Sequence, residues 1–226
     1  MPAPASPVRV IQMGLGPIGQ RVVQYLVERR AVQLAAAIDI DPAKVGRDAG
    51  ELCGVKPLGV AVTDQVAAAL ATPAEVVLLT TGSTFAKVVP QIEQCLRAGK
   101  SVVSTCEELA FPWDRDPALA RRVDQLARER GAVVLGTGVN PGFLMDALPI
   151  FLTSVCRRVD RVRVERHQDA AQRRLPFQQK IGAGLTPAEF EQKRAAGVIR
   201  HVGFEESIRM VARALGWTLE RVEEIV

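Results

Sequence analysis

Aromatic side chains and histidine are scarce in this chain of 226 residues. Phe, Trp and Tyr make up 4% of the sequence, and the only histidines are His167 and His201. Proteins that bind single-stranded nucleic acid stack bases on aromatic side chains and present a strongly basic surface. The net charge here is +4. The composition therefore argues against nucleic-acid binding.

Paired cysteines and long apolar runs are also missing. Without a CxxC pair, neither a structural zinc site nor a disulfide framework is expected, and we predict no metal. No apolar run reaches the roughly 18 residues of a membrane span, and the first residues, MPAPASPVRV, lack the apolar core of a signal peptide. We therefore expect a cytoplasmic protein without a membrane partner. The four cysteines are Cys53, Cys95, Cys106 and Cys156.

Short apolar runs alternate with helix-length amphipathic segments between residues 8 and 135. Runs such as VVLL and AVVL are apolar at consecutive positions, which is typical of strands covered on both faces. This alternation predicts an α/β fold with a parallel, doubly wound Rossmann sheet. The predicted strands are Val8–Met13, Gln33–Ile38, Val60–Thr63, Glu75–Thr80, Ser101–Thr105 and Ala132–Leu135, and the predicted helices Pro17–Arg30, Asp64–Ala71, Phe85–Ala98 and Pro117–Arg130.

The pattern changes after Gly136. The alternating segment VDRVRVE (Val159–Glu165) predicts a half-buried strand of a second sheet. Helices are predicted over Thr186–Ala196, with Thr186 as N-cap, and over Gly203–Leu215. We therefore expect a Rossmann domain over residues 1–140 and the start of an α+β substrate or oligomerisation domain over residues 141–226. One strand and two helices make a small core, so the second domain is expected to be truncated.

Two consequences follow for this second region. An unfinished sheet leaves an exposed edge, which favours either self-association or poor solubility, and we expect a homo-oligomer such as a dimer. Seven arginines lie between Arg157 and Arg174. Their alternation with apolar residues predicts a solvated strand face and loop, and a site for an anionic substrate is the alternative.

A GxGxxG motif, formed by Gly14, Gly16 and Gly19, lies between the first predicted strand and the first predicted helix. Glycine at these positions allows a tight turn, close approach of a pyrophosphate, and packing of the helix on the strand. The helix N-terminus that begins with Pro17 and Ile18 attracts phosphate through its free N–H groups. The motif predicts dinucleotide binding.

Asp39 supports this interpretation, because it lies twenty residues beyond Gly19 at the end of the second predicted strand. An acid at this position accepts hydrogen bonds from the adenosine ribose hydroxyls. Its charge repels a 2′-phosphate and so favours NAD(H). Lys44 and Arg47 lie nearby and leave NADP(H) open.

In this type of sheet, ligands bind beyond the carboxyl ends of the strands. Two adjacent carboxylates, Glu107 and Glu108, follow the fifth predicted strand and are the candidate catalytic residues. His201 is a candidate on the substrate side, although a lone histidine is more often structural. The residues expected to line the cofactor are Thr80, Thr81, Gly82 and Asn140. For Asn140, a plain interdomain turn is the alternative.

Four segments carry a family resemblance: GLGPIGQ, AAAIDIDPAKVGRDAGELCG, STCEELAFP and, above all, GTGVNPGFLMDALP. Together they resemble the 2,4-diaminopentanoate dehydrogenases and the related native amine dehydrogenases, which share a dihydrodipicolinate-reductase-like architecture. RHVGFEES is similar to a second-domain motif of the same family. The similarity covers nearly the whole chain, although other family members are usually much longer.

The resemblance implies an NAD(P)-dependent oxidoreductase acting on a C–N bond, by oxidative deamination of a small amine or amino acid, or by reductive amination of a ketone. It also implies that an acid near the nicotinamide handles water and ammonia, and the matching positions are Glu107 and Glu108. If the preceding strand is buried, the first residue past it, Glu107, is the better placed. The alternatives are a dihydrodipicolinate reductase, whose paired-histidine motif has no counterpart here, and a non-catalytic dinucleotide-binding module.

Overall fold

The computed structural model describes residues 6–167, 169–172, 175–199 and 201–225. The chain divides into two compact units, Met1–Val139 and Asn140–Val226.

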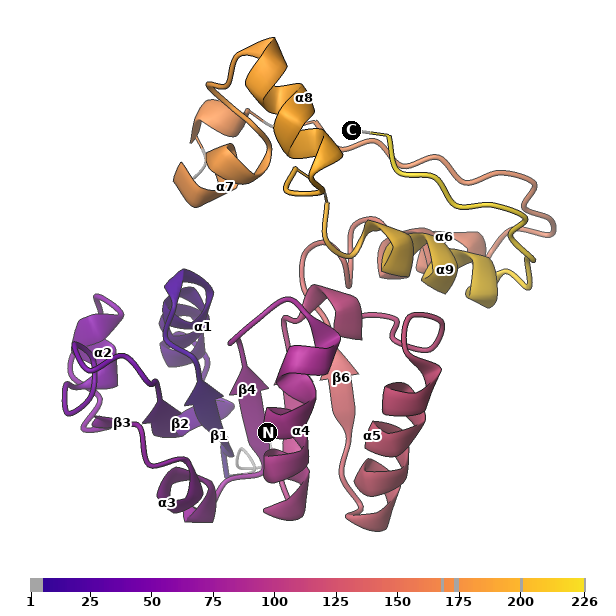
Figure 1. Ribbon diagram of the computed structural model, residues 1–226. Coiled ribbons are helices and arrows are strands. Elements are labelled where there is room, and N and C mark those ends of the chain that lie inside the picture. The colour runs from indigo at the N-terminus through magenta and orange to yellow at the C-terminus, as the bar shows by residue number, and fades with distance from the viewer. Residues whose placement is uncertain (1–5, 168, 173–174, 200, 226) are drawn as a thin grey trace. The chain divides into compact units, whose positions relative to one another are not determined.

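The first unit is built on a six-stranded sheet in the order β3-β2-β1-β4-β5-β6 (Figure 1). Each pair of neighbouring strands is parallel, so all the carboxyl ends lie at one edge. The predicted α/β Rossmann sheet is confirmed, and the order reverses between β1 and β4, where such sheets bind ligands. The strands are β1 (Val8–Met13), β2 (Val32–Ile38), β3 (Val62–Thr63), β4 (Val76–Leu79), β5 (Ser101–Ser104) and β6 (Val134–Gly136).

Helices cover the two faces of this sheet unequally. Buried side chains of α3 (Val66–Ala71), α4 (Phe85–Arg97) and α5 (Pro117–Glu129) pack in one cluster with β1, β2, β4 and β5. A second cluster joins α1 (Pro17–Val27) and α2 (Ala49–Leu52) to β1, β2 and β3. On β6, Val133 just before the strand and Leu135 within it stay 65% and 50% exposed. The sequence predicted strands covered on both faces, and for β6 this is wrong.

Most elements of the first unit were predicted within a few residues, but α2 was missed. This single turn begins at Asp48, whose carboxylate accepts hydrogen bonds from the N–H groups of Gly50 and Glu51. The same carboxylate also accepts from the N–H groups of residues 58–60. These long-range bonds hold the turn, and a four-residue helix has no periodicity that a sequence pattern can detect.

Helices alone form the regular elements of the second unit, within the residues that the structure describes. They are α6 (Ala147–Thr153), the 3₁₀ turn η2 (Ala170–Gln172), α7 (Leu175–Lys180), α8 (Pro187–Ala195) and α9 (Phe204–Ala214). Helices α8 and α9 confirm two predictions. Thr186 caps α8 as expected and forms a capping box with Glu189.

The predicted strand Val159–Glu165 is wrong, because this segment forms no ladder with any other stretch of the described residues. Its alternation is nevertheless real: Val162 and Val164 are half-buried, and Arg161 and Arg163 are exposed. An alternating pattern reports which side chains face an apolar surface, whereas a strand also needs a neighbour for its backbone hydrogen bonds. None of the helices in the described ranges is long and apolar enough to cross a membrane.

Candidate active site

The glycine turn joins β1 to α1. Gly14 has a φ of 93°, in the left-handed region that favours glycine. A Cβ atom on Gly19 would lie 1.9 Å from the carbonyl oxygen of Gly14, so only glycine lets the helix pack on the turn. A Cβ on Gly16 would meet nothing within 4 Å. The first and third glycines of the motif are thus required by the protein itself, while the second faces open space.

This open space lies at the N-terminus of α1. Gly16 is the N-cap of the helix, no side chain caps it, and Pro17 occupies the first turn. Free N–H groups and the helix dipole at such an end attract anions. A pyrophosphate bound here would be held by the N–H groups at Gly16 and in the first turn of α1, which contains Ile18 and Gly19.

The side chain of Gln12 holds the glycine turn in place through hydrogen bonds, a role that sequence reasoning missed. Its side chain is fully buried on β1, and its Nε2 donates to the carbonyl oxygen of Gly14 at 2.8 Å and to Oγ1 of Thr80 at 2.9 Å. The Thr80 hydroxyl donates to the same Gly14 carbonyl at 2.8 Å. The glycine turn and the loop after β4 are therefore one hydrogen-bonded unit. A glutamine inside an apolar strand, two residues before the first glycine of the motif, was the available signal.

The loop after β4 holds three of the residues predicted to line the cofactor. Thr80 is half-buried and hydrogen-bonded to the glycine turn as just described. The hydroxyl of Thr81 donates to Oε1 of Gln91 on α4 at 2.5 Å. A Cβ atom added at Gly82 would lie 3.6 Å from a methyl group of Val88, which is an ordinary van der Waals contact. All three lie at the carboxyl edge of the sheet.

Asp39 follows β2 and braces the same turn. Its Oδ2 accepts from the N–H of Leu15 at 2.7 Å and pairs with Lys44 at 3.1 Å, while Oδ1 accepts from the N–H of Asp41 at 2.9 Å. Burial alone would raise the pKa of Asp39, but these hydrogen bonds and the Lys44 charge together hold it below its usual value. Asp39 is therefore an anion at neutral pH.

The two adjacent acids after β5 have different surroundings. They open the 3₁₀ turn η1 (Glu107–Leu109). Glu108 is 5% exposed, and its Oε2 accepts from the N–H of Phe85, the first residue of α4, at 2.8 Å. Its Oε1 lies 3.5 Å from Arg115. Glu107 is half-buried, and within the described ranges no hydrogen bond or ion pair engages its carboxylate. Glu107 is thus the acid available at the rim.

Cys106, between β5 and these acids, is a poor nucleophile. The thiol is 1% exposed, and burial raises its pKa to about 12. A thiol is reactive only as the thiolate. Cys106 is therefore not a candidate nucleophile at this edge of the sheet.

In the second unit, two predicted residues that are far apart in sequence come together. Nδ2 of Asn140 lies 3.4 Å from Nε2 of His201. Oδ1 of Asn140 is buried and has no hydrogen-bond partner within the described part of the chain. Nearby in sequence, the buried Asp146 accepts from the hydroxyl of Ser207 at 2.7 Å and from the N–H of Gly142 at 2.8 Å. The segments GTGVNPGFLMD and RHVGFEES are therefore joined by side-chain contacts.

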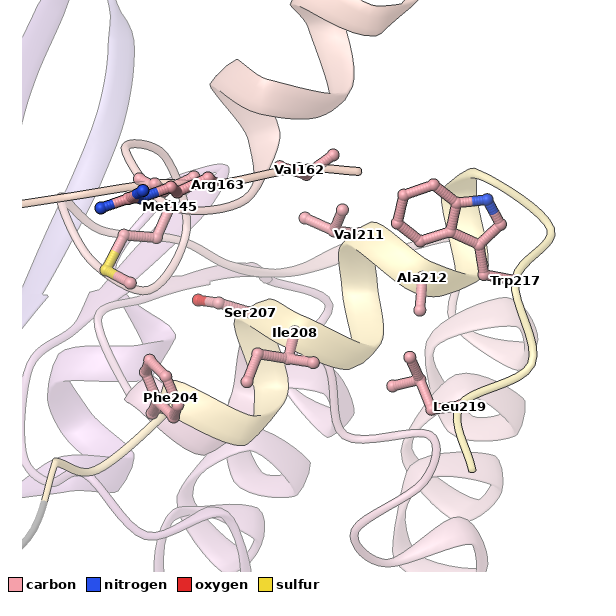
Figure 2. A pocket seen from close by; sticks show the side chains of 11 residues that line it. Met145, Val162, Arg163, Phe204, Ser207, Ile208, Val211, Ala212, Trp217 and Leu219 are labelled. Atoms are coloured by element: carbon pink, nitrogen blue, oxygen red, sulfur yellow. The ribbon is translucent and has the colours of Figure 1, made fainter. Parts of the chain in front are cut away.

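The second unit also contains an apolar cavity of about 350 Å³. Figure 2 shows its lining along α9, from Phe204 at one end to Trp217 beyond the other, with Val162 and Arg163 across from the helix. None of the predicted catalytic or cofactor-binding residues lines it. Its other lining residues are Met145, Val164, Ser207, Ile208, Val211, Ala212 and Leu219.

The first unit is thus a Rossmann-type dinucleotide-binding domain, defined by its parallel sheet, its glycine turn and the acid at the end of β2. Comparison with known families agrees with this class. Residues 8–106 match the profile of the dihydrodipicolinate reductase N-terminus. Residues 143–226 match the profile of the 2,4-diaminopentanoate dehydrogenase C-terminal domain.

Individual relatives are similar to nearly the whole chain. The chain is 34% identical over 222 residues to 2,4-diaminopentanoate dehydrogenase of Acetoanaerobium sticklandii, covering 94% of this chain and 61% of the relative. It is 32% identical to an amine dehydrogenase of Streptomyces virginiae, and the match covers 96% of this chain and 62% of the relative. The solved amine dehydrogenase of Mycobacterium smegmatis superimposes with a TM-score of 0.78 at 25% identity, covering 95% and 63%. The resemblance to the 2,4-diaminopentanoate and amine dehydrogenases is confirmed, and the chain spans about three fifths of these relatives' length.

Proposed function

We propose that the chain acts as an NAD(P)-dependent oxidoreductase on a C–N bond, by oxidative deamination of a small amine or amino acid, or by reductive amination of a ketone. The observation that carries this proposal is the unengaged carboxylate of Glu107, at the edge of the sheet where the glycine turn offers a pyrophosphate site. The relatives named amine and 2,4-diaminopentanoate dehydrogenases support the C–N bond as the target.

The nicotinamide, when bound, accepts or supplies the hydride. In deamination, hydride loss leaves a substrate iminium cation, which the negative charge of Glu107 stabilises. Glu107 then takes a proton from the water that attacks the iminium carbon, and the resulting carbinolamine expels ammonia to give the ketone. In the reverse direction the same carboxylate takes a proton from ammonium. General base catalysis of this kind contributes about 10²–10⁴-fold.

For the cofactor we propose NAD(H). A carboxylate offers about four acceptor sites, and Asp39 already uses three of them on Leu15, Lys44 and Asp41. It therefore has capacity for about one ribose hydroxyl, whereas the sequence suggested two. Lys44 is paired with both Asp39 and Asp41. The net charge of these three groups is negative and disfavours a 2′-phosphate.

On the second unit, we propose that Asn140 and His201 serve the substrate or the nicotinamide carboxamide. The support is the buried Oδ1 of Asn140, which has no hydrogen-bond partner among the residues the structure describes, and the contact of this side chain with His201. The homodimer and the cytoplasmic location stay predictions from the sequence. Analytical ultracentrifugation of the purified chain measures the first of them.

The dihydrodipicolinate reductase alternative is less well supported. The matching reductase profile ends at residue 106, and residues 143–226 match the dehydrogenase profile. Offering dihydrodipicolinate beside simple ketones separates the two reactions. A chain that binds NADH but turns over neither would be the non-catalytic module.

Replacement of Glu107 tests the proposed role directly. We expect Glu107→Gln to bind NADH about as well as the wild type and to lower kcat by roughly 10²–10⁴-fold, because the amide neither accepts the proton nor stabilises the cation. Glu129→Gln, on the exposed side of α5, is the control and should leave kcat unchanged. A loss of only a few-fold in Glu107→Gln would remove Glu107 from the mechanism.

A further inference from the structure

Glu108 makes contacts with two other elements of the fold. Its backbone N–H donates to the carbonyl oxygen of Ser83 at 3.3 Å, and its carboxylate accepts from the N–H of Phe85 at 2.8 Å. Ser83 lies in the loop after β4, and Phe85 is the first residue of α4. We propose that Glu108 is a positioning residue, which holds η1 so that Glu107 points to the rim. This proposal rests on the role proposed for Glu107.

The geometry of the turn explains how one acid aims the other. A 3₁₀ helix has three residues per turn, so adjacent side chains point about 120° apart. When Glu108 is held inward against the start of α4, Glu107 is directed roughly a third of a turn away. The burial of the one acid thereby fixes the direction of the other.

The surroundings of Glu108 stabilise the negative charge of its carboxylate. Its carboxylate lies at the N-terminus of α4, a helix of 13 residues, where the dipole and the unpaired N–H groups favour an anion. Arg115 adds a positive charge at 3.5 Å from the other carboxylate oxygen. A buried carboxylate at 5% exposure needs such partners, and removing it leaves the Phe85 N–H buried without an acceptor.

The opposite side of η1 is fixed by packing. A Cβ on Gly136 of β6 would lie 2.3 Å from the carbonyl oxygen of Leu109, so the turn rests directly on the strand. Leu109 is 5% exposed. The turn η1 therefore packs against β6 on one side and against the start of α4 on the other. The hydrogen bond from the Phe85 N–H to the Glu108 carboxylate joins the turn to α4 and sets its orientation. Misplacing a catalytic group by about 1 Å costs on the order of 10²-fold in rate.

Glu93 offers a matched control within the same unit. It is 7% exposed on α4, and its carboxylate binds Arg122 at 2.5 Å and Arg97 at 3.2 Å. It is thus a second buried, ion-paired glutamate. It lies eight residues beyond Phe85, roughly 12 Å along the helix from the Glu108 contact. Its loss should affect stability without affecting the rim.

The kinetic test is a double-mutant cycle between Glu107→Gln and Glu108→Ala. We expect Glu108→Ala to lower kcat by about 10²-fold with little change in KM, and to have at most a few-fold effect in the Glu107→Gln background. Glu108→Gln keeps an oxygen for the Phe85 N–H and should recover kcat to within about 10-fold of wild type. Glu93→Ala should leave kcat unchanged. Equal effects of Glu108→Ala in both backgrounds would overturn the proposal.

Amide hydrogen exchange gives a readout that does not need turnover. We expect Glu108→Ala to speed exchange at Phe85, Leu109 and Ala110, and Glu93→Ala to leave these amides protected as in the wild type. Unchanged protection in Glu108→Ala would also overturn the positioning role. If the wild-type chain turns over no substrate but exchange responds as expected, the proposed function fails while the Glu108 contact stands as a structural one.

Discussion

The glycine turn predicts opposite outcomes for two substitutions that look alike in the sequence. In Gly19→Ala, the new Cβ would lie 1.9 Å from the Gly14 carbonyl oxygen and 2.8 Å from Oγ1 of Thr80. The first of these is backbone and cannot rotate away, so α1 must shift. In Gly16→Ala, the new Cβ meets no protein atom within 4 Å, and it projects into the space proposed for the pyrophosphate.

The magnitudes differ accordingly. Overpacking of this kind costs about 1–3 kcal/mol, and the backbone clash places Gly19→Ala at the upper end, or roughly 6–12 °C in Tm for a domain of this size. Gly16 is an N-cap with extended backbone angles that alanine also adopts, so Gly16→Ala should cost less than about 1 kcal/mol. Its NADH affinity should nevertheless fall at least about 10-fold, because the methyl group excludes the phosphate.

Two assays on the same protein preparations separate these effects. Thermal unfolding followed by circular dichroism reports the packing cost, and titration of NADH fluorescence reports the affinity. The reasoning is refuted if Gly16→Ala binds NADH as the wild type does, or if it is as unstable as Gly19→Ala. Either result would mean that the second glycine of the motif does not face the ligand.

Two other side chains give further predictions. Asp39→Asn keeps an acceptor for the Leu15 N–H but removes the negative charge and leaves Lys44 paired with Asp41 alone. Affinity for NADPH should therefore rise relative to NADH by about 10-fold, and parallel fluorescence titrations with an unchanged ratio would contradict this. Hydrogen bonding to Arg122 holds the pKa of Glu93 below its ordinary value of 4.5, against the opposing effect of burial. A carboxyl group with a lowered pKa in the folded state stabilises the protein above pH 4.5, and this stability is lost as the pH falls below that value. Glu93→Gln should therefore flatten the dependence of Tm on pH between about 5 and 3. An unchanged slope would exclude Glu93 as a cause of that dependence.

The sequence predicts the glycine turn, the helix after it and the position of Asp39 well, because these are local signals at fixed spacing. The carboxyl edge of a parallel sheet then brings together loops after β1, β2, β4 and β5 without further information. For the same reason Glu107 and Glu108 could be placed on the rim before the structure was known.

What sequence could not predict depends on tertiary neighbours. The difference between Glu107 and Glu108 arises from the start of α4, which lies more than twenty residues earlier in the chain. The segment Val159–Glu165 has the alternation of a strand, but the described residues supply it with no partner strand. The exposed face of β6 likewise depends on tertiary packing, because no helix in the described part of the chain covers Val133 and Leu135. A run of consecutive apolar residues does not distinguish a strand covered on one face from a strand covered on both.

The central claim is hydride transfer at a C–N bond, and the most direct measurement is NADH oxidation by the purified chain offered small ketones with and without ammonium. The account predicts oxidation that requires both ketone and ammonium, that is faster with NADH than with NADPH, and that is nearly abolished in Glu107→Gln. Oxidation that is independent of ammonium, or no oxidation despite NADH binding, would contradict it.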